Sequence, residues 1–236
     1  MTDAVEIRMD HPARNALGSE LVAWLESELD RAGERAVLLT GTGDAFCAGL
    51  NLEEVASLDG AGLESMLLAV DRLAARLFDH PAPTVALVNG HAIAGGCVLV
   101  QCCDHRVAAD SPTARIGLNE VALGACFPPR ILSILRFRLP IEHQHELLLG
   151  ASLYPPRRAL ELEMLDAVGE EPETKARAWL ERTAAHPRAT YAHTKRILQH
   201  GVTENSAEDE RRFREEELPI WSSPELKQRV LAVLGK

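Results

Sequence analysis

The sequence predicts an α/β protein whose N-terminal part pairs its strands in parallel and whose C-terminal part is helical. Two observations lead to this fold class. Short apolar runs alternate with helical patterns over about the first 140 residues, and helical patterns follow one another from about residue 132 onward. The order strand, helix, strand indicates parallel pairing, because parallel strands need a crossover segment between them.

The alternating part contains two well-marked amphipathic helices. The first is expected to follow Ser19, a favourable N-cap residue, and the second is stopped by Pro81 and Pro83. Apolar residues recur at helical spacing in both, namely Leu21, Val22, Leu25 and Leu29 in the first and Leu63, Met66, Leu67, Val70, Leu73 and Leu77 in the second. Each helix therefore has one apolar face to bury.

Short apolar runs between and after these helices predict buried strands. They cover residues 36–40, which Gly41 closes, then 84–88 and 106–109, whereas 5–9 offers the only strand before residue 15. We expect residues 1–140 to form the α/β core and residues 141–236 a C-terminal helical region. Proline suits the first turn of a helix, and it marks plausible helix starts at Pro140, Pro155-Pro156, near Glu173, Pro187 and Pro224. The charged stretch 206–217 is expected to be a solvated helical face.

Composition excludes several functional classes. The chain has 236 residues, 46% of them hydrophobic and 25% charged, and a formal net charge of −10, which disfavours a nucleic-acid or anionic-membrane surface. No apolar run reaches the roughly 18 residues of a membrane helix, and the acidic N-terminus lacks the order of a signal peptide, so we expect a cytoplasmic protein. The five cysteines are expected to be free thiols, and the spacing of Cys102, Cys103 and His105 does not predict a metal site.

Two glycine-containing turns follow the two best strands. They are residues 45–52, AFCAGLNL, and residues 88–97, VNGHAIAGGC. Open α/β folds place ligands where strands leave the sheet, and glycine there lets backbone N–H groups face a cavity. Either turn alone is more simply explained as an ordinary strand-to-helix connection. The sequence contains neither GxGxxG nor GxxxxGK[ST], so a dinucleotide fold or P-loop gains little support.

Three ordered segments together resemble one known family. AFCAGLNL, VNGHAIAGGCVLVQCCDHRVAAD and ARIGLNEVALGACFPP look like the signature segments of the crotonase, or enoyl-CoA hydratase/isomerase, superfamily. The resemblance extends from Asn15-Ala16-Leu17 to the C-terminal helices. It implies a crotonase-like spiral of ββα units with a C-terminal helical trimerisation region, assembled as a homotrimer or dimer of trimers. It also implies an acyl-CoA thioester substrate and no separate cofactor, since coenzyme A is part of the substrate.

The resemblance assigns an oxyanion hole to the backbone N–H groups of Leu50 and Gly95. Negative charge develops on a thioester oxygen when an α-proton leaves, and fixed donors meet that charge without reorganisation. If Gly95 opens a helix, its free N–H also benefits from the positive end of the helix dipole.

The acidic residues then decide between reactions of the family. Hydratases of the family use two glutamates; here one of these positions is Val98, which cannot activate water, and the other is Glu120. A single carboxylate suits a proton shuttle from C2 to C4 of a 3-enoyl thioester, so the sequence favours a Δ3,Δ2-enoyl-CoA isomerase of fatty acid β-oxidation. Hydration, decarboxylation of a β-carboxyacyl thioester, and non-enzymatic acyl-CoA binding or assembly in a β-oxidation complex remain alternatives. On the residues alone, Glu120 is better explained as a solvated or helix-capping acid, and the flanking match to the family reverses that preference.

Further residues are candidates for contacts with coenzyme A or the acyl chain. Ala48, Asn51 and Leu52 match the stretch that packs near the adenine in the family, and Arg14 is a candidate for a phosphate contact. Phe127 is expected to line the acyl pocket. His91 is expected to be structural, Asp44 and Glu53 are surface acids that could approach the site, and Lys227 and Arg229 could reach coenzyme A from a neighbouring subunit.

Overall fold

The computed structural model describes residues 4–235 and contains two parallel sheets. The larger sheet has the strand order β1-β2-β4-β6-β8, and the smaller one has the order β3-β5-β7. The strands of the larger sheet are β1 (Val5–Met9), β2 (Val37–Gly41), β4 (Thr84–Val88), β6 (His105–Ala109) and β8 (Ala167–Gly169). Those of the smaller sheet are β3 (Ala45–Cys47), β5 (His91–Ile93) and β7 (Ile116–Gly117).

Consecutive strands alternate between the two sheets, which produces a spiral. β2 is followed by β3, β4 by β5 and β6 by β7, and each pair places one strand in each sheet. The first two pairs are followed by helices that return the chain to the next strand of the larger sheet. This repeat is the ββα spiral that the sequence predicts, and its short second strands end where the two glycine turns lie.

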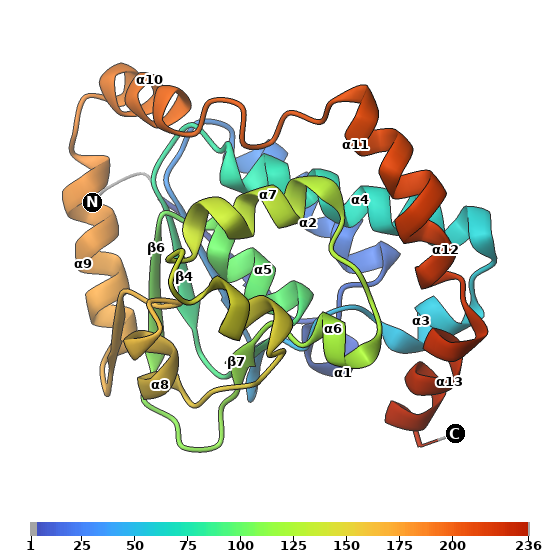
Figure 1. The fold of residues 1–236 in the computed structure, drawn as a ribbon. Coiled ribbons are helices and arrows are strands. Elements are labelled where there is room, and N and C mark those ends of the chain that lie inside the picture. Colours follow the sequence, from blue (N-terminus) through green and yellow to red (C-terminus); the bar gives the residue numbers. More distant parts are fainter. Residues whose placement is uncertain (1–3, 236) are drawn as a thin grey trace.

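The helices cover the sheets on several sides (Figure 1). Those of the first part are α1 (Pro12–Asn15), α2 (Ser19–Ala32), α3 (Leu52–Ser57), α4 (Gly60–Phe78), α5 (Gly95–Cys102), α6 (Glu120–Leu123) and α7 (Pro129–Arg138). The later part contains α8 (Pro156–Glu161), α9 (Pro172–Ala184), α10 (Arg188–Leu198), α11 (Ala207–Arg212), α12 (Leu218–Trp221) and α13 (Pro224–Val233), with π-helical turns η1 (His145–Leu149) and η2 (Phe213–Glu217). α5 runs through the centre of the molecule, behind α7 in Figure 1.

The larger sheet is buried on both faces, which explains its uninterrupted apolar runs. Alternate residues of β2 point to opposite sides: Leu39 joins the main core with α2, α4 and α5, whereas Leu38 packs with Leu180 of α9 on the other face. A separate apolar cluster joins α4 to the C-terminal helices through residues such as Leu67 and Trp221. Three cores therefore hold the sheets, the outer helix α9 and the α11–α13 segment.

The structure refines several sequence-based boundaries. α2 begins at Ser19 with Gly18 as its N-cap, so Ser19 is the first helical residue and not the cap. Pro140 is followed by a turn and then η1, and no regular helix begins there. The region after residue 140 is not purely helical, because β8 pairs in parallel with β6. Its helices also separate: α9 lies against the larger sheet, while α11–α13 lie beside α3 and α4 (Figure 1). The division at residue 140 and the role of residues 141–236 in trimerisation stay predictions.

Candidate active site

A cavity of about 270 Å³ lies where β3 and β5 leave the smaller sheet. We call it the Glu120 cavity. Its wall is largely apolar and includes Leu67 and Val70 of α4, Val98 of α5, Ile131 of α7 and Trp221 of α12. Ala48, Leu50, Gly95 and Glu120 line it as well, so the glycine turns and the third signature segment meet in one place. An apolar cavity with a few polar groups is the usual form of a small-molecule site.

The first turn of the cavity wall depends on a glycine. Gly49 has φ +94°, and a Cβ built on it would lie 2.8 Å from the Ile93 carbonyl oxygen. A side chain is therefore excluded both by the backbone conformation and by the closeness of the second turn. This glycine lets the two turns approach, and it places the Leu50 N–H directly after the closest point.

The second turn presents an amide at the start of a helix. Ala94 has φ +50°, a region that non-glycine residues rarely adopt, and Gly95 is the first residue of α5. The first N–H groups of a helix have no intrahelical acceptor, and they carry the positive end of its dipole. A Cβ built on Gly95 would lie 3.8 Å from the Leu50 nitrogen, so the two amides are neighbours. Neither N–H donates a hydrogen bond to another described residue.

Glu120 is the first residue of α6, and one of its carboxyl oxygens has no partner. The Oε2 atom is buried and makes no hydrogen bond within residues 4–235. Burial raises the pKa of Glu120 to about 8, although a hydrogen bond from its own backbone N–H opposes this effect. The side chain is thus mostly protonated at neutral pH and can exchange a proton there, a property typical of catalytic acids and bases.

No second carboxyl group from the described residues lines the cavity. Val98 is 2% exposed and contributes apolar wall. Cys126 is the other titratable side chain there, and burial, followed by the nearby Glu217, raises the pKa of its thiol, which is therefore neutral at pH 7. Proton transfer inside this cavity has one carboxyl to use.

The comparisons with known proteins identify the family. Residues 2–220 match the family described as enoyl-CoA hydratase/isomerase. This chain belongs to the enoyl-CoA hydratase/isomerase family. The predicted membership and the predicted crotonase-like fold are confirmed, and the protein is an enzyme of that family.

Relatives of the family carry different activities in their names. Human mitochondrial enoyl-CoA delta isomerase 1 is 31% identical over 177 residues, 73% of this chain and 59% of that protein, so the chain spans about three fifths of the human relative. A putative enoyl-CoA hydratase of Thermus thermophilus is 34% identical over 205 residues, 83% of this chain and 79% of that protein. The crystal structure of human mitochondrial delta3-delta2-enoyl-CoA isomerase has a TM-score of 0.87 and 25% identity, covering 98% of this chain and 93% of that one. Family membership alone therefore leaves the reaction open.

Among the residues predicted to bind the substrate of this hydratase/isomerase, three line the cavity. They are Ala48, Leu52 and Phe127. Asn51 does not, because its side chain caps α3 by accepting hydrogen bonds from the N–H groups of Glu53 and Glu54. Its predicted place near an adenine stays untested, and the structure gives the side chain a local role.

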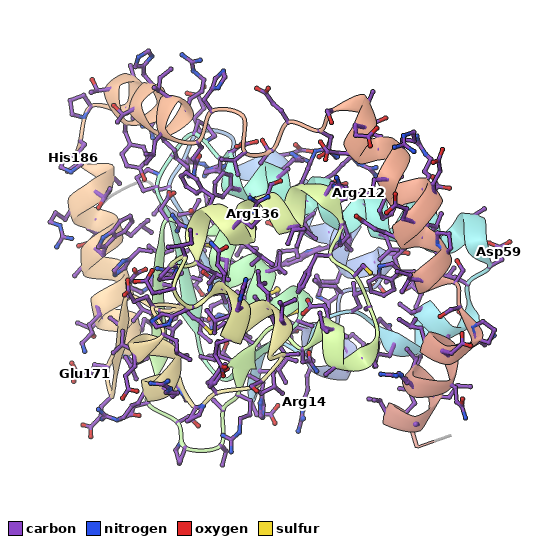
Figure 2. All side chains as sticks on the ribbon, viewed as in Figure 1. Arg14, Asp59, Arg136, Glu171, His186 and Arg212 are labelled. Atoms are coloured by element: carbon purple, nitrogen blue, oxygen red, sulfur yellow. The ribbon has the colours of Figure 1, made fainter. Side chains whose placement is uncertain are left out.

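Arg14 lies outside the Glu120 cavity and already has an ionic partner. Its guanidinium is 2.9 Å from the Asp44 carboxylate, and both side chains are 61% exposed. Arg14 lies at the lower edge of the molecule in Figure 2. A phosphate contact of Arg14 remains a prediction, and it would compete with this exposed ion pair, which is itself worth little in water.

The other polar candidates also lie outside the cavity wall. Asp44 and Glu53 are exposed and do not line it, so neither supplies the second carboxyl that hydration would need. His91 accepts a hydrogen bond from the Arg115 N–H through Nδ1, as expected for a structural histidine. Arg229 donates to the Ala122 carbonyl oxygen at the end of α6, and Lys227 lines a separate cavity.

The C-terminal helices contribute to the site in a way that the sequence did not predict. Trp221 and Val233 line the cavity, and the Trp221 indole donates a hydrogen bond to the Cys126 carbonyl oxygen at 3.0 Å. Leu67 and Val70 were assigned only to an apolar helix face, and their spacing could not reveal that this face meets a ligand cavity. Within residues 4–235 no helix is long and apolar enough to span a membrane, and no cluster of metal-binding side chains is found.

Proposed function

We propose that this family member isomerises 3-enoyl-CoA to trans-2-enoyl-CoA, in the breakdown of unsaturated fatty acids. The observation that carries the proposal is the composition of the Glu120 cavity. It combines one carboxyl, whose buried Oε2 accepts no hydrogen bond from residues 4–235, with apolar walls and two neighbouring backbone amides that donate to none of those residues. That set suits a reaction that moves one proton and holds one negative charge.

The first step would place the thioester oxygen between the amides of Leu50 and Gly95. Glu120, in its carboxylate form, then removes a proton from C2. The charge spreads over a dienolate whose oxygen accepts hydrogen bonds from both amides, and preorganised donors of this kind typically contribute about 10²–10³ in rate each.

The second step returns the proton at the other end of the dienolate. Glu120, now protonated, donates to C4, and the double bond ends between C2 and C3. The C2 proton is removed and a C4 proton is added, so the reaction needs no water, no cofactor and no second acid. A pKa of about 8 leaves about one tenth of the carboxyl ionised at pH 7 and half of it at pH 8, so the base form and the acid form are both accessible.

Hydration is the main alternative, and the cavity wall argues against it. Adding water across a 2-enoyl thioester needs a group that activates water as well as a group that protonates C2. The family resemblance assigns one of the two hydratase glutamates to position 98, where this chain has a valine, and Asp44 and Glu53 lie outside the wall. A valine at 2% exposure cannot hydrogen bond to water.

The oligomeric state and the cellular location are also proposals. We propose a homotrimer or dimer of trimers, as is usual in the family, and a cytoplasmic location. Size-exclusion chromatography with light scattering would measure the first of these directly.

Incubation with 3-cis- and 3-trans-enoyl-CoA in deuterated water tests the reaction. We expect conversion to a conjugated 2-enoyl thioester, which is measured by its ultraviolet absorbance. Hydrogen from C2 should be delivered to C4, and deuterium should appear at C4 only to the extent that the Glu120 proton exchanges with solvent before its transfer. In a parallel assay, water addition to crotonyl-CoA should be far slower. Rapid hydration of crotonyl-CoA with 3-enoyl substrates left unchanged would refute the proposal in favour of a hydratase.

A further inference from the structure

The segment Asn15-Ala16-Leu17 contacts both turns that carry the paired amides. Its first residue ends a run of three successive residues with left-handed φ, namely Ala13 at 53°, Arg14 at 59° and Asn15 at 57°. Non-glycine residues in this region are uncommon, and a run of three persists only where surrounding contacts fix it. The contacts that fix it lead directly to the amide turns.

The Asn15 side chain hydrogen bonds to β3, the strand that leads into the first turn. Asn15 is 1% exposed, and its Nδ2 group donates to the carbonyl oxygens of Ala45 and Phe46, each at 3.2 Å. Its Oδ1 accepts from the His11 N–H at 2.8 Å, which closes the left-handed turn. One buried amide side chain thus ties the turn at residues 11–15 to the strand that ends at Cys47.

Leu17 fixes the first turn through its backbone. Its N–H donates to the Gly49 carbonyl oxygen at 2.7 Å, and its carbonyl oxygen accepts from the Asn51 N–H at 3.0 Å. In a parallel pairing of this kind, the residue between those two partners turns its own N–H and C=O to the opposite side. That residue is Leu50, so the bridge directs the Leu50 N–H away from Leu17.

Leu17 also contacts the second turn through its side chain. Leu17 is fully buried, and its Cδ1 atom would lie 2.9 Å from a Cβ built on Gly95. The same residue therefore orients the first amide by hydrogen bonds and packs against the residue that carries the second.

We propose that Asn15 and Leu17 are positioning residues that set the separation and direction of the Leu50 and Gly95 amides. This inference rests on the proposed function, because it assumes that both amides bind the thioester oxygen. Neither residue lines the Glu120 cavity, so they act through the turns and not on the substrate.

The test uses a reporter of hydrogen bonding to the thioester. A 2-enoyl-CoA labelled with ¹³C at C1 is bound to the enzyme, and isotope-edited infrared spectroscopy records its carbonyl stretch. In the wild type the stretch should move to lower frequency on binding, because both amides polarise the carbonyl. In Asn15→Asp, a carboxylate would face the Ala45 and Phe46 oxygens and displace β3, so the movement should shrink. We expect kcat on 3-enoyl-CoA to fall about tenfold or more, up to the roughly 10²–10³ of a lost donor, while KM changes little.

Matched variants separate positioning from general stability. Thr84→Val removes the two hydrogen bonds between the Thr84 hydroxyl and Asp104, which lie at the start of β4 and therefore at the end of this strand away from the amide turns. Leu17→Val trims the contact with Gly95, and Leu38→Val trims a comparable buried leucine that packs on the α9 face. Thr84→Val and Leu38→Val should keep the carbonyl stretch and kcat of the wild type at a temperature where every variant is folded. If Asn15→Asp does not fold, Leu17→Val against Leu38→Val decides the question.

The outcomes distinguish the two proposals. A wild-type carbonyl stretch and kcat in both Asn15→Asp and Leu17→Val would overturn the positioning role and leave the isomerase proposal intact. A wild-type enzyme that binds the labelled thioester without any change in its carbonyl stretch would show that no oxyanion hole exists, and would overturn both.

Discussion

Replacement of Glu120 by glutamine should abolish isomerisation and change how stability depends on pH. The pKa of Glu120 is raised to about 8 by burial, from an ordinary value of 4.5. Only the carboxylate accepts a proton from C2, so the active fraction is about one tenth at pH 7 and about nine tenths at pH 9. Accordingly, kcat/KM of the wild type on 3-enoyl-CoA should rise about tenfold for each pH unit below 7 and level off above pH 8.

The stability effect has the opposite direction. Between pH 4.5 and 8 the folded protein keeps the Glu120 proton that the unfolded chain releases, so the free energy of unfolding falls as pH rises in this window. One group contributes up to about 1.4 kcal/mol per pH unit, or on the order of 5 kcal/mol over the whole window. Glu120→Gln has no proton to lose. It should match the wild type near pH 5 and become the more stable protein by pH 8.5.

The assays are denaturant unfolding and steady-state kinetics at pH 5.5, 7 and 8.5. Glu53→Gln is the matched control, because Glu53 is an exposed glutamate outside the cavity; it should change neither profile. In Glu120→Gln, kcat should fall by at least about 10²–10⁴, the usual contribution of a general base. Turnover in Glu120→Gln above one tenth of wild type, or a wild-type kcat/KM that does not vary between pH 6 and 9, would refute the reasoning.

Three further substitutions address the walls of the site. Val98→Glu places a carboxyl at the position where hydratases of the family have a glutamate, and it should produce measurable hydration of crotonyl-CoA. Because position 98 is buried, the new ionisable group should lower the free energy of unfolding by several kcal/mol in denaturant titrations. Trp221 lines both the Glu120 cavity and a second cavity of about 240 Å³, which Leu63 and Val230 also line. Trp221→Ala should raise kcat/KM for long relative to short 3-enoyl chains and lower the free energy of unfolding by about 3–5 kcal/mol, whereas Trp221→Phe should keep the wild-type chain-length preference. Gly49→Ala places a Cβ 2.8 Å from the Ile93 carbonyl oxygen and should lower kcat more than tenfold, measured beside thermal unfolding.

The sequence was sufficient for the parts of the fold that follow from local pattern. β2, β4 and β6 were predictable because a sheet buried on both faces leaves continuous apolar runs, and α4 because its apolar face repeats at helical spacing. β3, β5 and β7 were not predicted, since strands of two or three residues are too short to show any period. β8 was hidden among helices for the same reason.

The residues of the site were likewise predictable only where a local sequence pattern marks them. Glu120, Leu50 and Gly95 were predicted as site residues because each lies in a signature segment, and the structure places all three around one cavity, while their chemical roles stay predictions. Trp221 was missed because its position depends on a contact with Cys126, 95 residues away in the chain, which no local pattern encodes. Arg14 and Asn51 match the family in sequence, but an ion pair with Asp44 and the cap of α3 already occupy their side chains.

The raised pKa of Glu120 also bears on why an apolar residue at position 98 suits isomerisation. A carboxylate at position 98 would lie in the same small cavity, and two neighbouring carboxyls cannot both ionise at low cost, so one of them would hold its proton more tightly. A shared proton helps a reaction in which water must be oriented by one acid and activated by the other. It hinders a shuttle in which one group must first be a base and then an acid toward the same dienolate. An apolar wall at position 98 leaves burial as the main influence on Glu120. Burial, opposed by the hydrogen bond from the backbone N–H of Glu120, raises its pKa to about 8, close enough to neutral pH for a single group to perform both steps.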